Sequence, residues 1–263
     1  MDVRPVVDGD LPAVAEIARA NDEPDGGDPR YVSHLRNNGR FLVAEVDGKP
    51  AGYCGIRQAD GLTMLCDLFV DPARHGGGAG GRLLEVALDG PGERSTFASR
   101  DPRAMSLYVR HGMIPRWPLL YLSGPPPVRS HVLLAERVPV EDAGVAELDL
   151  NGRDRAADYA YWATRPGAAG LVVRDGGTVV AAGAAEPGRV IHLVTADDHD
   201  PAATLTAALG TFDADRVRLC LPGPHPALPS LLNARWRIED LDQHMASRAD
   251  LLSPASVLSP SLA

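Results

Sequence analysis

Residues 68–84 read LFVDPARHGGGAGGRLL, and this stretch decides how the rest of the chain is interpreted. An apolar run ends at Asp71-Pro72, six small residues follow at positions 76–81, and an apolar helical pattern comes next. Glycines at such a point leave main-chain N–H groups open at the start of a helix, where the helix dipole favours an anion. The stretch therefore predicts a strand, a phosphate-binding turn and a helix.

A dinucleotide-binding turn is one interpretation of these glycines. Gly76, Gly78 and Gly81 have the spacing of the dinucleotide fingerprint, and Asp101 follows twenty positions later. The fingerprint should follow its strand at once, however, and five residues, 71–75, intervene here. Asp101 also precedes a proline and a helical pattern, so it resembles a helix cap more than a strand end.

The segments around the glycine turn alternate between strand and helix patterns. A hairpin is predicted around Asp47-Gly48, because this dipeptide favours a tight turn between strands. The other predicted elements are a strand at 3–7, a helix from Leu11 capped by Asp10, strands at 41–46, 51–56 and 63–70, a helix after the turn, a strand at 95–99, a helix at 104–111 ended by Gly112, and a strand at 117–122. The run at 124–127, Gly-Pro-Pro-Pro, is predicted to be a linker.

The second half repeats the pattern of the first half. Residues 138–142 resemble residues 4–8, and residues 170–177 resemble the hairpin that starts at Phe41. Residues 190–195 and 227–236 occupy the places of 63–70 and 104–113. We therefore expect two copies of one α/β unit, as domains 1–127 and 128–263.

The glycine stretch resembles the acetyl-CoA-binding motif of the GNAT superfamily of N-acetyltransferases. That motif is a strand, Asp or His with Pro, two or three residues, then Arg/Gln-Gly-x-Gly-x-Gly/Ala and a helix. Residues 101–113, DPRAMSLYVRHGM, resemble the family's second motif, Asn-x-x-Ala-x-x-Leu-Tyr-x-x-x-Gly-Phe. The resemblance implies an α/β acyl-CoA N-acyltransferase (GNAT) fold, a mixed sheet flanked by helices, in two tandem copies. Two positions depart from the family: His75 replaces Arg or Gln, and Asp101 replaces Asn.

The resemblance also implies which residues hold acetyl-CoA. Main-chain groups of Leu68, Phe69 and Val70 would bind the pantetheine arm. The pyrophosphate would lie on the amides of Gly76, Gly77, Gly78, Ala79, Gly80 and Gly81, with the side chains of His75 and Asp101 nearby. Tyr108 stands at the position of the family's general acid, where a protonated phenol can donate to the leaving sulfur.

The residue that deprotonates the amine is left open. Asp67 lies on the strand beside the acyl site, but alternation along a strand could turn it to the other face of the sheet. Asp22, Glu23 and His34 lie in segments that could frame the acceptor, and a water chain could also carry the proton.

The second copy lacks the features that would bind CoA. Residues 195–201, TADDHDP, replace the glycine turn with an acidic one, and Leu231 replaces the tyrosine. An acidic turn repels phosphate, so we expect that the C-terminal half does not bind acetyl-CoA.

Composition limits the function classes further. The net charge of −9 and pI of about 5.3 argue against nucleic acid or an anionic membrane as partner. No apolar run approaches the ~20 residues of a membrane span, and Met1 is followed by acidic residues rather than a signal peptide. Cys54, Cys66 and Cys220 lack paired spacing, so neither a disulfide framework nor a metal site is expected.

Three functional hypotheses follow. The first is a cytoplasmic N-acetyltransferase that moves an acetyl group directly from acetyl-CoA to a primary amine of an unidentified acceptor. The second is an acyl-CoA-binding sensor or partner-docking protein with little or no turnover. The third is a nucleotide-dependent oxidoreductase. The oligomeric state is open, with a homodimer as one option.

Overall fold

The computed structural model describes the main chain of residues 1–263 and every side chain except those of Pro24 and Asp25. Internal contacts divide the chain into two compact units. The N-terminal unit is Met1–Arg116 with His244–Leu251 and Leu262, and the C-terminal unit is Trp117–Gln243 with Leu252–Ser261 and Ala263. The boundary between the units does not fall at the predicted linker, 124–127. The strand before that linker, β6 (Ile114–Gly124), already lies mostly in the C-terminal unit. The domain division at residue 127 stays a prediction from the sequence repeat.

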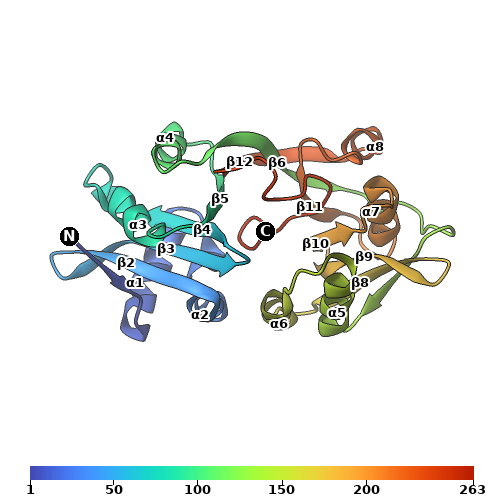
Figure 1. The fold of residues 1–263 in the computed structure, drawn as a ribbon, viewed down its shortest axis with the longest axis horizontal. Helices are drawn as coiled ribbons and strands as arrows, with labels where there is room; N and C mark the ends of the chain where they lie inside the picture. The colour runs from blue at the N-terminus through green and yellow to red at the C-terminus, as the bar shows by residue number, and fades with distance from the viewer. The chain divides into compact units, whose positions relative to one another are not determined.

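The N-terminal unit is a mixed sheet with the strand order β1-β2-β3-β4-β5 (Figure 1). The β4–β5 pair is parallel, and the other pairs are antiparallel. Its elements are β1 (Asp2–Pro5), η1 (Asp8–Asp10), α1 (Leu11–Ala20), η2 (Pro24–Gly27), α2 (Pro29–Asn38), β2 (Gly39–Val46), β3 (Lys49–Ala59), β4 (Leu62–Val70), η3 (Pro72–Arg74), α3 (Ala79–Ala87), β5 (Glu93–Ala98) and α4 (Pro102–Arg110).

Local sequence signals explain several of these boundaries. The hairpin between β2 and β3 is confirmed, with Asp47 and Gly48 both at positive φ (53° and 71°). Helix α1 starts after Asp10 as predicted, but the Asp10 side chain does not cap it. The carboxylate instead pairs with the Arg4 guanidinium at 2.7 Å and accepts the Val7 N–H at 2.9 Å. Asp10 therefore ties β1 to the turn before α1.

Apolar side chains cover both faces of the N-terminal sheet. Leu42, Cys54 and Leu65 pack with α3 residues such as Leu83 on one face. Helix α2 covers the other face. On that face the Tyr53 ring stacks on the Phe41 ring, with centroids 5.5 Å apart. The two layers hold β4 between them, so the end of β4 is a fixed platform.

The C-terminal unit is also a mixed sheet, with the order β12-β6-β11-β10-β9-β8-β7 (Figure 1). Here β10 and β11 are parallel, and the pairs β6–β11, β7–β8, β8–β9 and β9–β10 are antiparallel. Its elements are β6 (Ile114–Gly124), β7 (Leu134–Val138), α5 (Val140–Asn151), α6 (Ala156–Ala163), β8 (Ala169–Asp175), β9 (Thr178–Glu186), β10 (Arg189–Thr195), α7 (Pro201–Leu209), β11 (Val217–Pro222), α8 (Leu228–Asn233) and β12 (Arg237–Ala246).

The element order of the two units is the same. A strand and a helix lead into an antiparallel three-stranded stretch, β2–β4 or β8–β10, and a parallel partner follows through α3 or α7. A last helix follows in each unit, α4 or α8. The predicted fold class, two copies of a mixed sheet flanked by helices, is confirmed.

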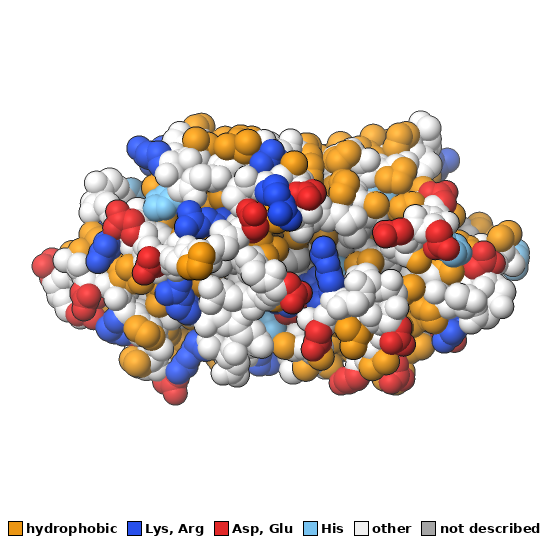
Figure 2. All heavy atoms as spheres, viewed as in Figure 1, with side chains coloured by type: hydrophobic (Ala, Val, Ile, Leu, Met, Phe, Trp, Pro, Cys, Tyr) orange, Lys and Arg blue, Asp and Glu red, His pale blue; other side chains and the backbone are white. Residues whose placement is uncertain are grey.

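The surface charges, the helix lengths and the cysteines complete the description of the fold. On the face shown in Figure 2, basic and acidic side chains are interspersed, and neither sign gathers into one patch. Among the described residues, no helix is long and apolar enough to cross a membrane. The three cysteines are free thiols, with Cys54 and Cys220 buried and Cys66 partly exposed.

Candidate active site

The turn after β4 has the backbone geometry that glycine allows. Gly76 and Gly78 have φ values of +81° and +84°, in the left-handed region that side chains with a Cβ rarely adopt. A Cβ built at either position would meet no atom within 4 Å. The turn therefore needs glycine for its conformation, and its outer side is open.

The start of α3 presents unpaired main-chain donors. The N–H of Arg82 donates to the Gly78 carbonyl at 3.1 Å, which is the first bond of the helix. The amides from Gly78 to Gly81 come before it and have no helical partner, as in any α-helix. With the positive end of the helix dipole at the same place, the turn can bind an oxyanion such as phosphate.

The end of β4 is free along the edge that would otherwise meet β5. The β4–β5 pairing covers only Leu62–Leu65 with Glu93–Thr96. Next to it, the register with β3 shifts so that Gly55 faces Asp67 and Ile56 faces Leu65, which makes Cys66 a bulge. Residues 68–70 lie beyond the β5 pairing, and their main-chain groups on that edge can bind an extended ligand, apart from the Val70 carbonyl, which accepts the Asn21 amide.

A pocket of about 410 Å³ joins the turn, the end of β4 and α4. Of the predicted site residues it contains Leu68, Phe69, Val70, His75, Gly76, Gly78, Ala79, Gly80, Gly81, Asp101 and Tyr108. Gly77 and Asp67 do not line it. It also contains residues that the motif comparison missed, Asn21, Arg74, Ser99, Arg103, Ala104 and Leu107.

Tyr108 has one side in the core and one in the pocket. It is only 6% exposed, it belongs to the core cluster of α3 and α4, and it lines the pocket. The two interpretations of this residue, core aromatic and pocket residue, are therefore compatible. Burial fixes its ring in one position, as a group that must donate a proton at a defined point requires.

The side chains of His75 and Asp101 both contact main-chain groups of residues close to them in the sequence. The His75 Nε2 lies 3.2 Å from the Val70 carbonyl oxygen, which the Asn21 amide also approaches at 3.2 Å. Asp101 caps α4 by accepting the Arg103 N–H at 2.8 Å and pairs with the Arg103 guanidinium. The side-chain hydrogen bond from Arg103, with the backbone one, holds the pKa of Asp101 below its usual value. His75 thus secures the end of β4, and Asp101 stays ionised as a helix cap.

Asp67 lies behind the pocket wall rather than in it. Asp67 is 9% exposed and lies on β4, opposite Gly55 of β3. Burial and then the charges of Asp67 and Glu23 raise the pKa of the Tyr53 phenol. Glu23 lines the pocket, so two carboxylates and Tyr53 occupy one region at its edge. Sequence reasoning missed Tyr53, because an aromatic residue in an alternating strand is typical of a core.

The C-terminal unit fills the equivalent place with its own chain. Strand β10 pairs with β11 at its start, where Arg189 lies opposite Arg218. Further along β10, Leu193 exchanges two main-chain hydrogen bonds with Val257, at 2.9 and 3.1 Å, and the Leu258 N–H donates to the Cys220 carbonyl of β11. The segment that contains these residues therefore binds between the two strands where they separate.

The turn after β10 also differs from the glycine turn. The Asp200 carboxylate accepts the Ala202 N–H at 2.9 Å and so caps α7. Asp197 and Asp198 add two more negative charges, both exposed. An anion would meet a capped helix start and three carboxylates there, which supports the expectation that this unit does not bind CoA.

Comparison with known proteins agrees with the architecture. Residues 37–113 match the family model described as an acetyltransferase (GNAT) domain. No protein with a curated function matches the sequence. Many solved structures are similar to this chain, and several of them cover most of it. A provisionally assigned acetyltransferase from Pyrococcus horikoshii is 16% identical, with a TM-score of 0.77, covering 100% of this chain and 95% of that one.

Two further similar structures are a tandem GNAT protein and a GCN5-related N-acetyltransferase. A tandem GNAT protein from the clavulanic acid biosynthesis pathway is 13% identical, with a TM-score of 0.65 and coverage of 96% and 99%. A GCN5-related N-acetyltransferase from Anabaena variabilis is 15% identical, with a TM-score of 0.66 and coverage of 93% and 72%. Identities this low show a shared fold and leave the substrate open. Residues 37–113 thus match the GNAT acetyltransferase domain model, and the chain as a whole has the fold of a tandem GNAT protein.

Proposed function

We propose that this protein transfers an acetyl group from acetyl-CoA to a primary amine, with the active site in the N-terminal unit. One observation carries the proposal. The open amides at the start of α3, the unpaired edge of β4 and the Tyr108 ring line a single pocket. The match of residues 37–113 to the acetyltransferase (GNAT) domain model supports acyl transfer as the reaction type.

The residues present fit acetyl-CoA as the donor. The amides from Gly78 to Gly81 offer main-chain donors, and the turn is open on its outer side at Gly76 and Gly78, which suits a pyrophosphate. Residues 68–70 offer main-chain groups beyond the reach of β5, which suits the amides of a pantetheine arm. His75 contributes by fixing the Val70 carbonyl rather than by pairing with phosphate.

Direct transfer needs a neutral amine and a proton for the departing thiolate. Tyr108 is the proton donor in this proposal, since its ring is fixed in the pocket wall. Glu23 at the pocket edge and Asp67 behind it form the acidic side of the site, where an amine would lose its proton. We further propose a cytoplasmic enzyme, in keeping with its free thiols.

A coupled assay tests the proposal. Purified protein is mixed with acetyl-CoA and a panel of amines, and CoA release is followed with a thiol reagent while the melting temperature is measured in parallel. We expect CoA release that depends on at least one amine. Stabilisation by acetyl-CoA with no release for any amine would instead support the sensor or docking alternative. Absence of any stabilisation by acetyl-CoA would defeat both, and stabilisation by NAD(P) would revive the oxidoreductase hypothesis.

A further inference from the structure

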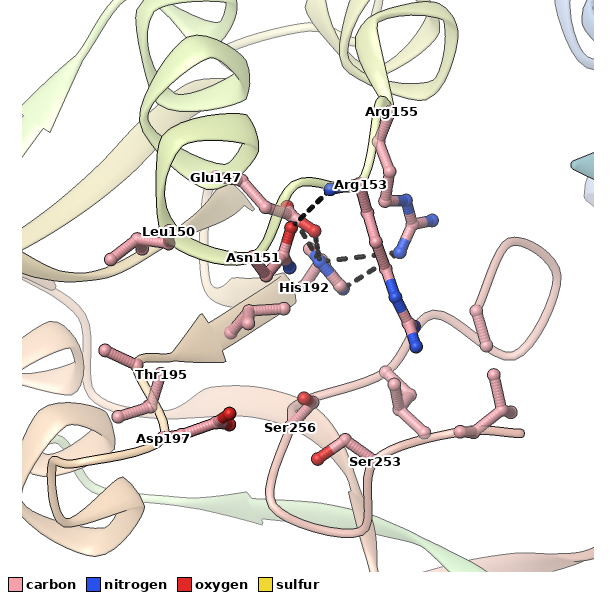
Figure 3. A pocket seen from close by; sticks show the side chains of 15 residues that line it. Glu147, Leu150, Asn151, Arg153, Arg155, His192, Thr195, Asp197, Ser253 and Ser256 are labelled. Atoms are coloured by element: carbon pink, nitrogen blue, oxygen red, sulfur yellow. Dashed lines mark hydrogen bonds and ion pairs between the residues drawn. The ribbon is translucent and has the colours of Figure 1, made fainter. Parts of the chain in front are cut away.

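The C-terminal unit contains a second pocket of about 400 Å³, which the proposed acetyl transfer does not use (Figure 3). Its walls are the end of α5, the loop that follows, the end of β10 with residues 196–197, and the segment 252–258. This volume is within the range of about 300–1,000 Å³ that is typical of small-molecule sites.

The floor of this pocket is a buried cluster of ionisable groups that bond to one another. Glu147 and His192 are each 1% exposed, with Oε2 and Nε2 3.0 Å apart. The Tyr159 hydroxyl donates to Glu147 at 2.6 Å. Arg155 pairs with buried Asp158 at 2.9 Å, with its guanidinium against the His192 ring. The groups of the floor are therefore partnered by one another and not by a ligand.

Two charges at the rim differ from this cluster, because neither has a counter-ion. Arg153 and Asp197 are exposed, and neither forms an ion pair with any residue that the structure describes. Both line the pocket, one from the loop after α5 and the other from the turn after β10. Figure 3 shows the two side chains entering the pocket from different walls. A single unpaired charge is common on a surface, but opposite charges on two walls of one pocket form a dipolar site.

Neutral polar groups complete the rim. The Asn151 Oδ1 accepts the Arg153 N–H at 2.9 Å, which fixes the loop and leaves the amide nitrogen as a donor. Ser253 and Ser256 present hydroxyl groups from the opposite segment, and Ser256 is only 4% exposed (Figure 3). That segment is anchored to β10 by the two hydrogen bonds between Val257 and Leu193, so its hydroxyl groups are held in place.

We propose that this pocket binds a small zwitterion, an α-amino acid, with its carboxylate on Arg153 and its ammonium group on Asp197. A guanidinium and a carboxylate on separate walls match both charges of such a ligand at once. A phosphate group on the ligand would meet the acidic turn after β10, of which Asp197 lines the pocket, so we do not expect a phosphorylated ligand. The site is independent of the acetyltransferase proposal.

Binding is tested on the full-length protein with the protein L-amino acids as probes. Each is added at millimolar concentration and the melting temperature is measured, followed by calorimetry for the best binder. Its carboxylic acid without the amine, and its amine without the carboxylate, are measured beside it. We expect stabilisation by one or a few amino acids, and at least about tenfold weaker binding by either half-molecule, since each loses one charged hydrogen bond.

Matched variants place the ligand in this pocket. Arg153→Gln and Asp197→Asn should each weaken binding of the best amino acid by at least about tenfold. The controls Arg237→Gln and Asp213→Asn change the same charges on exposed residues of the same unit outside the pocket, and should leave binding unchanged. Acetyl-CoA affinity should be the same in all four variants.

Three results would overturn the inference. The first is no stabilisation by any amino acid. The second is binding that survives both Arg153→Gln and Asp197→Asn, which would place the ligand elsewhere, for example at the acceptor site of the N-terminal unit. The third is equal affinity for the carboxylic acid without its amine, which would leave Asp197 without a role.

Discussion

The ends of β4 and β10 show how one fold produces an open site in one unit and a closed one in the other. Both strands run antiparallel to a hairpin strand and parallel to the next strand, and both part from that parallel neighbour before they end. At β4 the free edge faces a pocket and a glycine turn. At β10 the edge is taken by Val257, and the turn is acidic. The sheet thus supplies a binding edge in both units, and the segments that follow decide whether a ligand can use it.

The largest expected effect is on turnover. It tests whether the Tyr108 hydroxyl gives the N-terminal unit an activity that the C-terminal unit, with Leu231 at the corresponding place, lacks. Tyr108→Phe should lower turnover by about 100-fold, the lower end of what a proton donor contributes. Affinity for acetyl-CoA should hardly change, because the ring and its packing remain. Steady-state kinetics and calorimetry measure the two quantities. The control Tyr121→Phe removes a hydroxyl that donates to Asp242 at 2.6 Å in the C-terminal unit, and should leave turnover intact. Equal turnover in both variants would remove Tyr108 from the mechanism.

The second effect concerns stability and the ionic cluster of the C-terminal unit. Burial alone would raise the pKa of Glu147, but the charge and hydrogen bond of His192, the charge of Arg155 and the hydrogen bond of Tyr159 lower it from 4.5 to about 2. Because the pKa of Glu147 is lower in the folded protein than in the unfolded chain, its ionised form stabilises the fold at pH values above about 4.5. This stability is lost as the pH falls from about 4.5 towards about 2. The shift corresponds to about 3 kcal/mol.

Glu147→Gln should remove that contribution. Urea unfolding near neutral pH should show a loss of about 3 kcal/mol, and the gap from the unchanged protein should narrow as the pH is lowered through 4.5. Glu141→Gln on the same helix, where the side chain is exposed, is the control and should show no such gap. A gap that is constant between pH 7 and the acid range would mean that Glu147 acts by packing alone.

The third effect tests whether Val257 is a structural plug. Val257 is 1% exposed, so Val257→Ala should cost about 2 kcal/mol in lost burial and a small cavity. Thermal or urea unfolding measures the loss. Calorimetry with acetyl-CoA should still find one equivalent bound per chain, because the acidic turn remains. A second equivalent in this variant would show that the plug, rather than the turn, keeps CoA out.

The smallest effect tests the glycine turn. Gly78→Ala should weaken acetyl-CoA binding by about tenfold, through strain at positive φ and a Cβ on the ligand side. Gly61→Ala places the same methyl at φ +76° with no atom within 4 Å, in the β3–β4 turn and outside the pocket. The two variants should lose similar stability, but only Gly78→Ala should lose affinity. Equal affinities would mean that the amides at this turn do not bind the pyrophosphate.

Features that depend on neighbours in the sequence could be predicted. The glycine turn, the cap at Asp101 and the hairpin at Asp47-Gly48 each follow from local backbone chemistry, and the structure confirms them. Helix α2 was not predicted, because its apolar residues Tyr31, Val32 and Leu35 are few and its mean hydropathy is low. Periodicity gives a weak signal in such a short helix.

Features that depend on tertiary contacts were beyond the sequence. Nothing in the residues around Val257 indicates that they bond to β10, since that pairing joins positions far apart in the chain. The grouping of Glu147, His192 and Tyr159 has the same origin, because these residues come from three separate elements. The unpaired charges of the second pocket become visible only once these elements are assembled.

Strand β12 has a practical consequence for anyone who wishes to study the halves apart. Its last residues and the segment up to Leu251 belong to the N-terminal unit, where Met245 is fully buried in the core and His244 contacts Ser95 at 3.0 Å. A gene cut at the proline run would strip the first half of that core residue. The two halves should then fold well only when co-expressed.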